Sequence, residues 1–68
     1  MSIKVTVIVK KEENWYVAKC LENSVASQGK TIEESLENLR EASELYYEDN
    51  IPEVVNAPTF ITTLEVAL

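Results

Sequence analysis

Residues 31–49 constrain the fold most, because their hydrophobic side chains recur with the period of an α-helix. At about 100° per residue, four of them and a serine lie within one narrow stripe, and Ala42 and Tyr47 flank it. The stripe consists of Ile32, Leu36, Leu39, Ser43 and Tyr46. Thr31 and Glu34 fit a capping box at the start, and Asn50 and Pro52 follow the expected end. A helix with one apolar stripe needs a second element to cover it.

The residues before this helix alternate with the period of two that is typical of β-strands. Residues 3–10 place Ile3 and three valines on one face, and residues 14–22 follow as a second strand with apolar residues on both faces. Residues 24–28 predict a short third strand. Gly29, the single glycine, predicts a sharp turn with a positive φ angle.

Residues 59–68 return to strand-like alternation and complete the predicted fold. Phe60, Leu64, Val66 and Leu68 share one face with Thr62. The expected order is therefore β-β-β-α-β, an α+β fold in which one helix packs on one face of a single antiparallel or mixed sheet. The chain has 68 residues, of which 46% are hydrophobic, so we expect one marginally stable domain over residues 1–68.

The negative charge is concentrated on the predicted helix. The chain has a net charge of -6, and residues 31–49 contribute six Glu, one Asp and one Arg. This balance argues against a nucleic-acid binder, which contacts phosphates through a basic surface. The acidic face is either a solvated outer surface or a docking surface for a basic protein, and the predicted docking residues are Glu37, Glu41, Glu44 and Glu48.

Several classes of chemistry lack the residues they need. The sequence has no His and one Cys, so His-dependent metal sites, His general bases and an internal disulfide are excluded. The strands supply only Glu22 and Glu65 as carboxylates, too few for a two-metal nuclease, and Cys20 has no neighbour to activate it. We predict no catalytic residue, no metal and no cofactor, and therefore a protein that is not an enzyme.

The apolar segments are too short for a signal peptide or a membrane span. The expectation is a cytoplasmic protein with no membrane partner.

One helix can cover only one face of the sheet, so some apolar side chains are expected to need another partner. The residues predicted for such an interface are Ile8, Tyr16, Ala18 and Ile61. An uncovered apolar face and an exposed edge strand favour pairing across a two-fold axis. We expect a homodimer or a higher even-numbered oligomer.

Three ordered segments together resemble the HicB-like antitoxin domain of type II toxin–antitoxin systems. They are a strand phrase over residues 15–22, a turn phrase over residues 25–31 and a helix phrase over residues 33–42. The similarity extends over residues 3–50. Ser35 departs from the pattern, because the helix phrase usually has Ala at this position.

The resemblance implies a partial ribonuclease-H-like fold without its catalytic carboxylates. It also implies a partner, a basic HicA-type toxin that cleaves mRNA, whose active site the antitoxin covers. Many such antitoxins carry a DNA-binding domain after this one. The sequence stops at Leu68, so a short form without DNA-binding or autorepression is expected. The alternatives are an orphan oligomeric interaction module and a remnant of a ribonuclease-H-like enzyme.

Overall fold

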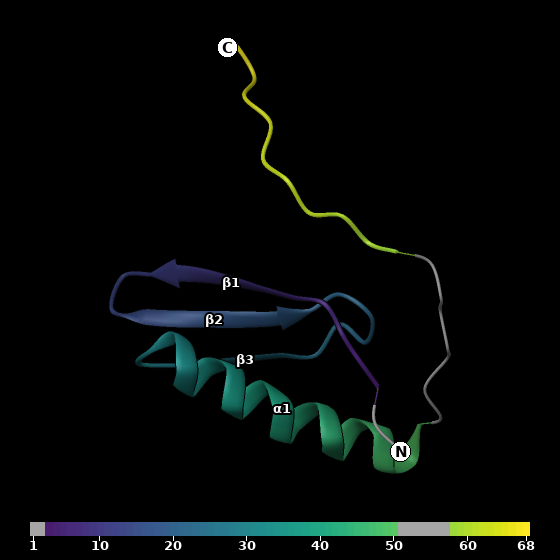
Figure 1. Ribbon diagram of the computed structural model, residues 1–68. Coiled ribbons are helices and arrows are strands. Elements are labelled where there is room, and N and C mark those ends of the chain that lie inside the picture. Colours follow the sequence, from purple (N-terminus) through teal and green to yellow (C-terminus); the bar gives the residue numbers. More distant parts are fainter. Residues whose placement is uncertain (1–2, 51–57) are drawn as a thin grey trace.

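The computed structural model describes residues 3–50 and 58–68, and its regular elements lie in the first of these ranges (Figure 1). They are β1 (Val7–Glu12), β2 (Trp15–Cys20), β3 (Ala26–Gly29) and α1 (Ile32–Asp49). The strands form one antiparallel sheet in the order β1-β2-β3. The predicted α+β class, with one helix packed on one sheet, is confirmed.

A tight hairpin joins β1 to β2, as the polar residues between the strands predict. Glu12 pairs with Trp15, and the register continues to the pair Val7 and Cys20. Glu13, in the turn, has a φ angle of 49°. Positive φ angles of this kind match the twist of a two-residue hairpin, so the turn fixes which side chains of β1 and β2 share a face.

The start of α1 is the predicted capping box. Thr31 is the N-cap, and its Oγ1 accepts a hydrogen bond from the Glu34 backbone N–H at 3.0 Å. Glu34 in turn accepts one from the backbone N–H of Lys30 at 3.1 Å. The first bond satisfies a donor that the first turn of a helix leaves without a partner, and the second fixes the residue just before the N-cap.

Replacing Thr31 with Ala is expected to lower the free energy of unfolding by about 1 kcal/mol, because the first turn loses its side-chain acceptor. For a domain of this size that corresponds to a fall in Tm of about 4–8 °C. Thermal unfolding followed by circular dichroism measures it, and Thr31→Ser, which keeps the acceptor, is the matched control. An unchanged Tm in Thr31→Ala would contradict a stabilising role for the cap.

Small side chains form the contact between α1 and the sheet. Ala18, Cys20 and Leu39 are the buried hydrophobic core, and Ser35 and Ser43 are the buried polar residues among those described. Ser35 satisfies its hydroxyl by donating to the Ile32 carbonyl at 2.7 Å. The helix therefore lies close over β2 and β3, with which it makes most of its contacts.

Gly29 explains how close this approach is. A Cβ built at Gly29 would lie 2.6 Å from the backbone N of Ser35 and 2.9 Å from backbone and side-chain atoms of Glu34. The predicted positive φ angle is wrong, because Gly29 does not have one. The position requires a glycine because the helix backbone occupies the space of a side chain.

The predicted apolar stripe of the helix is buried only at its centre. Leu39 and Ser43 are buried, whereas Ile32, Leu36 and Tyr46 are exposed. The sheet is too small to cover the whole stripe: α1, with its 18 residues, is about 27 Å long and β3, with four, about 13 Å.

The last predicted strand is not formed within the chain. Residues 58–68 have no regular secondary structure and every side chain in them is exposed. In Figure 1 this yellow-green segment runs away from the sheet and the helix. A strand needs the backbone of a neighbouring strand for its hydrogen bonds, and the segment has none here.

Candidate functional site

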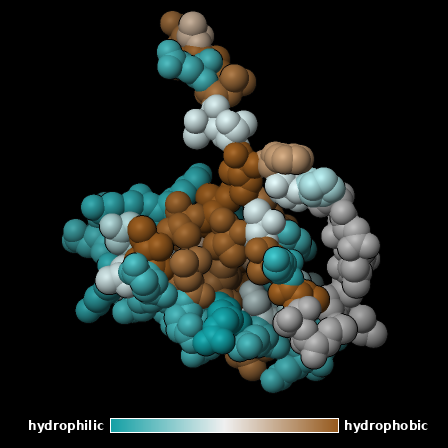
Figure 2. All heavy atoms as spheres, viewed as in Figure 1, coloured by the Kyte–Doolittle hydropathy of each residue, from teal (hydrophilic) through white to brown (hydrophobic). Residues whose placement is uncertain are grey.

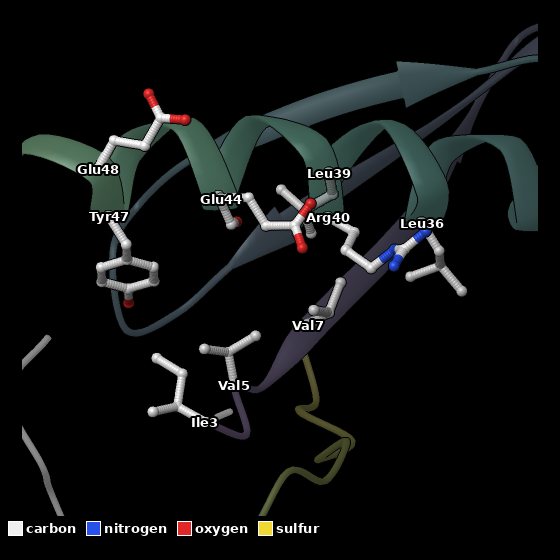
Figure 3. Close-up of a pocket in the computed structure, with 10 residues that line it drawn as sticks. Ile3, Val5, Val7, Leu36, Leu39, Arg40, Glu44, Tyr47 and Glu48 are labelled. Carbon is white, nitrogen blue, oxygen red and sulfur yellow. The ribbon is translucent and has the colours of Figure 1, made fainter. Parts of the chain in front are cut away.

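An apolar groove lies between the start of β1 and the exposed side of α1 (Figure 3). Its volume is about 720 Å³. Aliphatic side chains of the N-terminal segment face side chains of the helix across it, and the lining residues are Ile3, Val5, Val7, Leu36, Leu39, Arg40, Ser43, Glu44, Tyr47 and Glu48. Figure 2 shows hydrophobic side chains gathered over the middle of the molecule, with hydrophilic ones around them.

The groove exists because α1 is displaced toward one side of the sheet. The helix packs mainly on β3 and β2, and the small residues Gly29 and Ser35 let it approach there. On β1, Val7 and Val9 pair with Cys20 and Ala18 and pack against the core, yet both remain only partly buried. Leu36 and Tyr47 then form the opposite wall rather than filling the space.

Asn23 fixes the C-terminal half of α1 against the connection between β2 and β3. Its side-chain amide donates to Ser43 Oγ at 3.4 Å and to the Tyr47 hydroxyl at 3.3 Å, and its Oδ1 accepts from the Val25 N–H at 2.9 Å. Tyr47 also packs edge-on against Tyr46, with ring centroids 5.1 Å apart. The aromatic wall of the groove is therefore held in place by polar contacts from outside the helix.

The rim of the groove along the helix is charged. Arg40 forms an ion pair with Glu37, and its Nε also donates to Glu37 Oε2 at 3.3 Å. The hydrogen bond to Glu37, with the nearby negative charges, raises the pKa of Arg40 above its ordinary value. Glu44 and Glu48 also line the groove and have no hydrogen bond or ion pair among the described residues. The rim is thus acidic beside an apolar floor.

The four predicted docking residues are all exposed, but only two of them belong to the groove. Glu44 and Glu48 lie on its rim, Glu37 is engaged by Arg40, and Glu41 lies outside the lining. The apolar half of the groove was not predicted as a binding site. Its valines and leucines alternate as core residues do, so no local signal in the sequence distinguishes them.

The predicted oligomer interface stays a prediction, but the placement of two of its residues, Tyr16 and Ala18, on an uncovered face is wrong. Ala18 is completely buried beneath the helix, and Tyr16 lies on the same face of β2, half-buried, with Lys11 Nζ 5.9 Å from its ring centroid. The even-numbered residues of β2 face the helix because Ala18 pairs with Val9 and Ser27 on the covered side. Ile8 is half-buried on the opposite, uncovered face, and Ile61 is exposed.

Glu22 and Cys20 make contacts that stabilise the fold. The Glu22 carboxylate accepts a hydrogen bond from the Thr6 N–H at 2.7 Å, which lowers the pKa of Glu22. The buried Cys20 thiol donates weakly to the same oxygen at 3.6 Å. These contacts tie the N-terminal segment to the end of β2, so both residues serve the fold.

Across residues 3–50 and 58–68, no three His, Cys, Asp or Glu side chains are grouped as ligands of a metal ion. In the same part of the chain, no helix has the length and apolar character needed to cross a bilayer. What the arrangement offers is recognition: a hydrophobic depression that can accept apolar side chains, with carboxylates along one edge that favour a cationic neighbour.

No protein-family model, curated protein or solved structure matches the chain significantly. The groove and the acidic helix face are accordingly the features from which a function can be inferred.

Proposed function

We propose that this protein is an antitoxin-like inhibitor that binds a basic HicA-type mRNA-cleaving toxin and covers its active site. The observation that carries the proposal is the position of Glu44 and Glu48 on the rim of an apolar groove. A toxin that binds RNA has a basic surface, and the acidic rim is complementary to it. Apolar surface beside this rim would add the desolvated contacts that give a complex its lifetime.

The distribution of charge supports a protein partner rather than RNA itself. The first 30 residues carry five Lys and three Glu, so the negative charge of the chain lies on and after the helix. Direct binding of phosphates to this helix would be repulsive. The chain would therefore act on RNA metabolism only through the protein that cleaves RNA.

The resemblance of residues 15–42 to HicB-like domains supports the same partner. Its least typical position, Ser35, is compatible with the pattern, because the structure buries this side chain against β3 and a residue as small as Ala would fit there. The substitution changes a packing position and leaves the exposed acidic face unaltered.

Replacing Glu44 and Glu48 together with Gln is expected to slow association with a HicA-type toxin by about tenfold at low salt, because the steering charge at the groove is removed. Stopped-flow or surface plasmon resonance measurements between 20 and 300 mM salt would follow the rate. The wild-type rate should fall with salt, and the rate of the variant should be less sensitive to it.

The matched control is Glu12→Gln with Glu13→Gln. It removes the same charge from the hairpin turn, whose residues are also exposed but lie outside the groove. The control should slow association much less than the groove variant does. If the two pairs slowed association equally, the effect would come from net charge and not from the position of Glu44 and Glu48. If no HicA-type toxin bound the wild-type chain, the proposal would be overturned.

A second function, an oligomeric interaction module without a toxin, is favoured by one specific observation. Residues 58–68 expose five large apolar side chains, namely Phe60, Ile61, Leu64, Val66 and Leu68. Such a segment indicates an additional interaction in which this chain takes part, whichever partner the acidic rim binds.

A further inference from the structure

We propose that residues 58–68 of one copy dock as an added strand along the free edge of β1 in a second copy, with their apolar face over the groove. The reciprocal exchange would produce a homodimer with two such strands. The added strand would cover the apolar floor of the groove, so the toxin proposed above would meet the dimer through the acidic rim of Glu44 and Glu48. The dimer itself rests on two surfaces of the same chain, so its test does not require the toxin.

The donated segment has the properties of a strand without a neighbour. Phe60 is 88% exposed and Leu64 85% exposed, and they lie on one side of an extended chain together with Val66. Glu65 is its single charged residue. An exposed alternating segment with so little charge readily adds to an open sheet edge.

The receiving edge has matching properties. β1 is an outer strand of the sheet and pairs on one side with β2 alone. The groove lies directly beside it, floored by Val5 and Val7 and walled by Leu36. A strand added here would complete backbone hydrogen bonds along the edge and place every second side chain in the groove.

The alternation of the two strands agrees on both faces of the sheet. If Phe60, Leu64 and Val66 face the groove, Ile61 and Glu65 face the uncovered side. Ile8 and Lys10 lie on that side of β1, because Val7 and Val9 face the helix. Ile61 and Glu65 of the added strand would then share a face with Ile8 and Lys10 of β1. This face would bring together two apolar residues and two residues of opposite charge.

The surface area of the chain is consistent with such an exchange. The chain exposes 6068 Å², whereas a compact protein of 7.7 kDa exposes about 4,300 Å². The excess of about 1,700 Å² per chain is larger than the roughly 800 Å² that each partner buries in a standard protein–protein interface. A dimer could therefore bury an interface of standard size from this excess without unfolding any element.

The geometry favours a second copy, and not the same chain, as the source of the strand that docks on β1. Residues 58–68 run away from their own sheet, and no hydrogen bond joins them to residues 3–50 (Figure 1). A partner copy brings an identical edge and an identical segment, so both are satisfied at once by two-fold symmetry.

The test is the oligomeric state of the full chain by sedimentation equilibrium. Wild type should be a dimer, and Leu64→Glu with Val66→Glu should raise the dimer dissociation constant by about 100-fold or more, because two apolar contacts become buried charges. The matched control, Thr59→Glu with Thr63→Glu, adds the same charge to the other face of the segment and should remain dimeric. Both positions of the test variant are exposed in the single chain, so circular dichroism should report unchanged folding.

The receiving groove is tested separately by Leu36→Glu, with Leu45→Glu as its control. Both leucines are exposed on α1, but only Leu36 lines the groove. Leu36→Glu should weaken the dimer and Leu45→Glu should leave it intact. A monomeric wild type, or a dimer that is equally insensitive to the segment and groove variants, would overturn the proposal.

Crosslinking distinguishes exchange from docking within one chain. The variant Leu36→Cys with Leu64→Cys, treated with a short bis-maleimide, should give a covalent dimer, since each linked pair joins two copies. Wild type, whose Cys20 is buried, and each single Cys variant are the controls. An internally linked monomer as the main product would show that the segment returns to its own groove and would overturn the exchange.

Discussion

Replacing Gly29 with Ala is expected to lower the free energy of unfolding by about 3 kcal/mol or more. The added methyl group would lie 2.6 Å from the backbone N of Ser35 and 2.9 Å from the carbonyl carbon of Glu34. Backbone atoms cannot rotate away as the end of a long side chain can, so α1 would have to move off β3. A domain of this size has a total stability of only about 5 kcal/mol, and the variant would therefore be close to unfolding at room temperature.

Urea denaturation followed by helical circular dichroism measures this change, and two neighbouring substitutions are its controls. Lys30→Ala alters the adjacent residue, which is exposed and contributes its backbone rather than its side chain to the cap, so it should change stability by less than about 0.5 kcal/mol. Ser24→Gly should be neutral or stabilising, because Ser24 has a φ angle of 61°, a conformation that glycine adopts without strain. Wild-type stability in Gly29→Ala would mean that the helix does not lie this close to the strand.

The elements that the sequence predicts well are those determined by neighbours in the chain. The helix begins at the predicted position because Thr31 and Glu34 satisfy backbone donors within one turn. The first hairpin follows from two alternating segments separated by two turn residues. Both features depend on residues no more than 13 positions apart, so the pattern contains most of the information.

The orientation of the helix on the sheet could not be predicted in this way. A helical stripe shows which residues can be buried, but the sheet determines which of them are. Small residues at Gly29 and Ser35 bring the helix onto β3, and Leu36 is consequently left beside β1 as one wall of the groove. The groove thus results from contacts between distant positions, and its residues resemble ordinary core residues in the sequence.

The same distinction explains the last predicted strand and the acidic face. Alternation in residues 59–68 measures a local preference for extended structure, whereas a strand also needs an edge to pair with. Helical spacing correctly placed four glutamates on the exposed part of α1. Which of them border an apolar surface depends on the position of β1, and only Glu44 and Glu48 do so.

Replacing Leu39 with Ala is expected to lower the free energy of unfolding by about 2–5 kcal/mol, the range for a large-to-small change in a core. Leu39 is only 2% exposed, and it is the one large side chain of α1 in the buried core. Its removal leaves Ala18 and Cys20 without a covering side chain of comparable size. Four partly buried valines pack against the same core, and how far they relax into the space determines where in this range the loss falls.

Leu45→Ala is the matched control, because it makes the same chemical change on the same helix at a side chain that is 63% exposed. It should alter stability by less than about 0.5 kcal/mol, and a loss as large as that of Leu39→Ala would contradict the assignment of the core. Leu39 also forms the floor of the groove, so the two roles can be separated with Leu39→Met, which conserves volume and should cost less than about 1.5 kcal/mol. If Leu39→Met retains stability but weakens self-association or partner binding, the side chain that anchors the helix to the sheet also shapes the surface to which the partner binds.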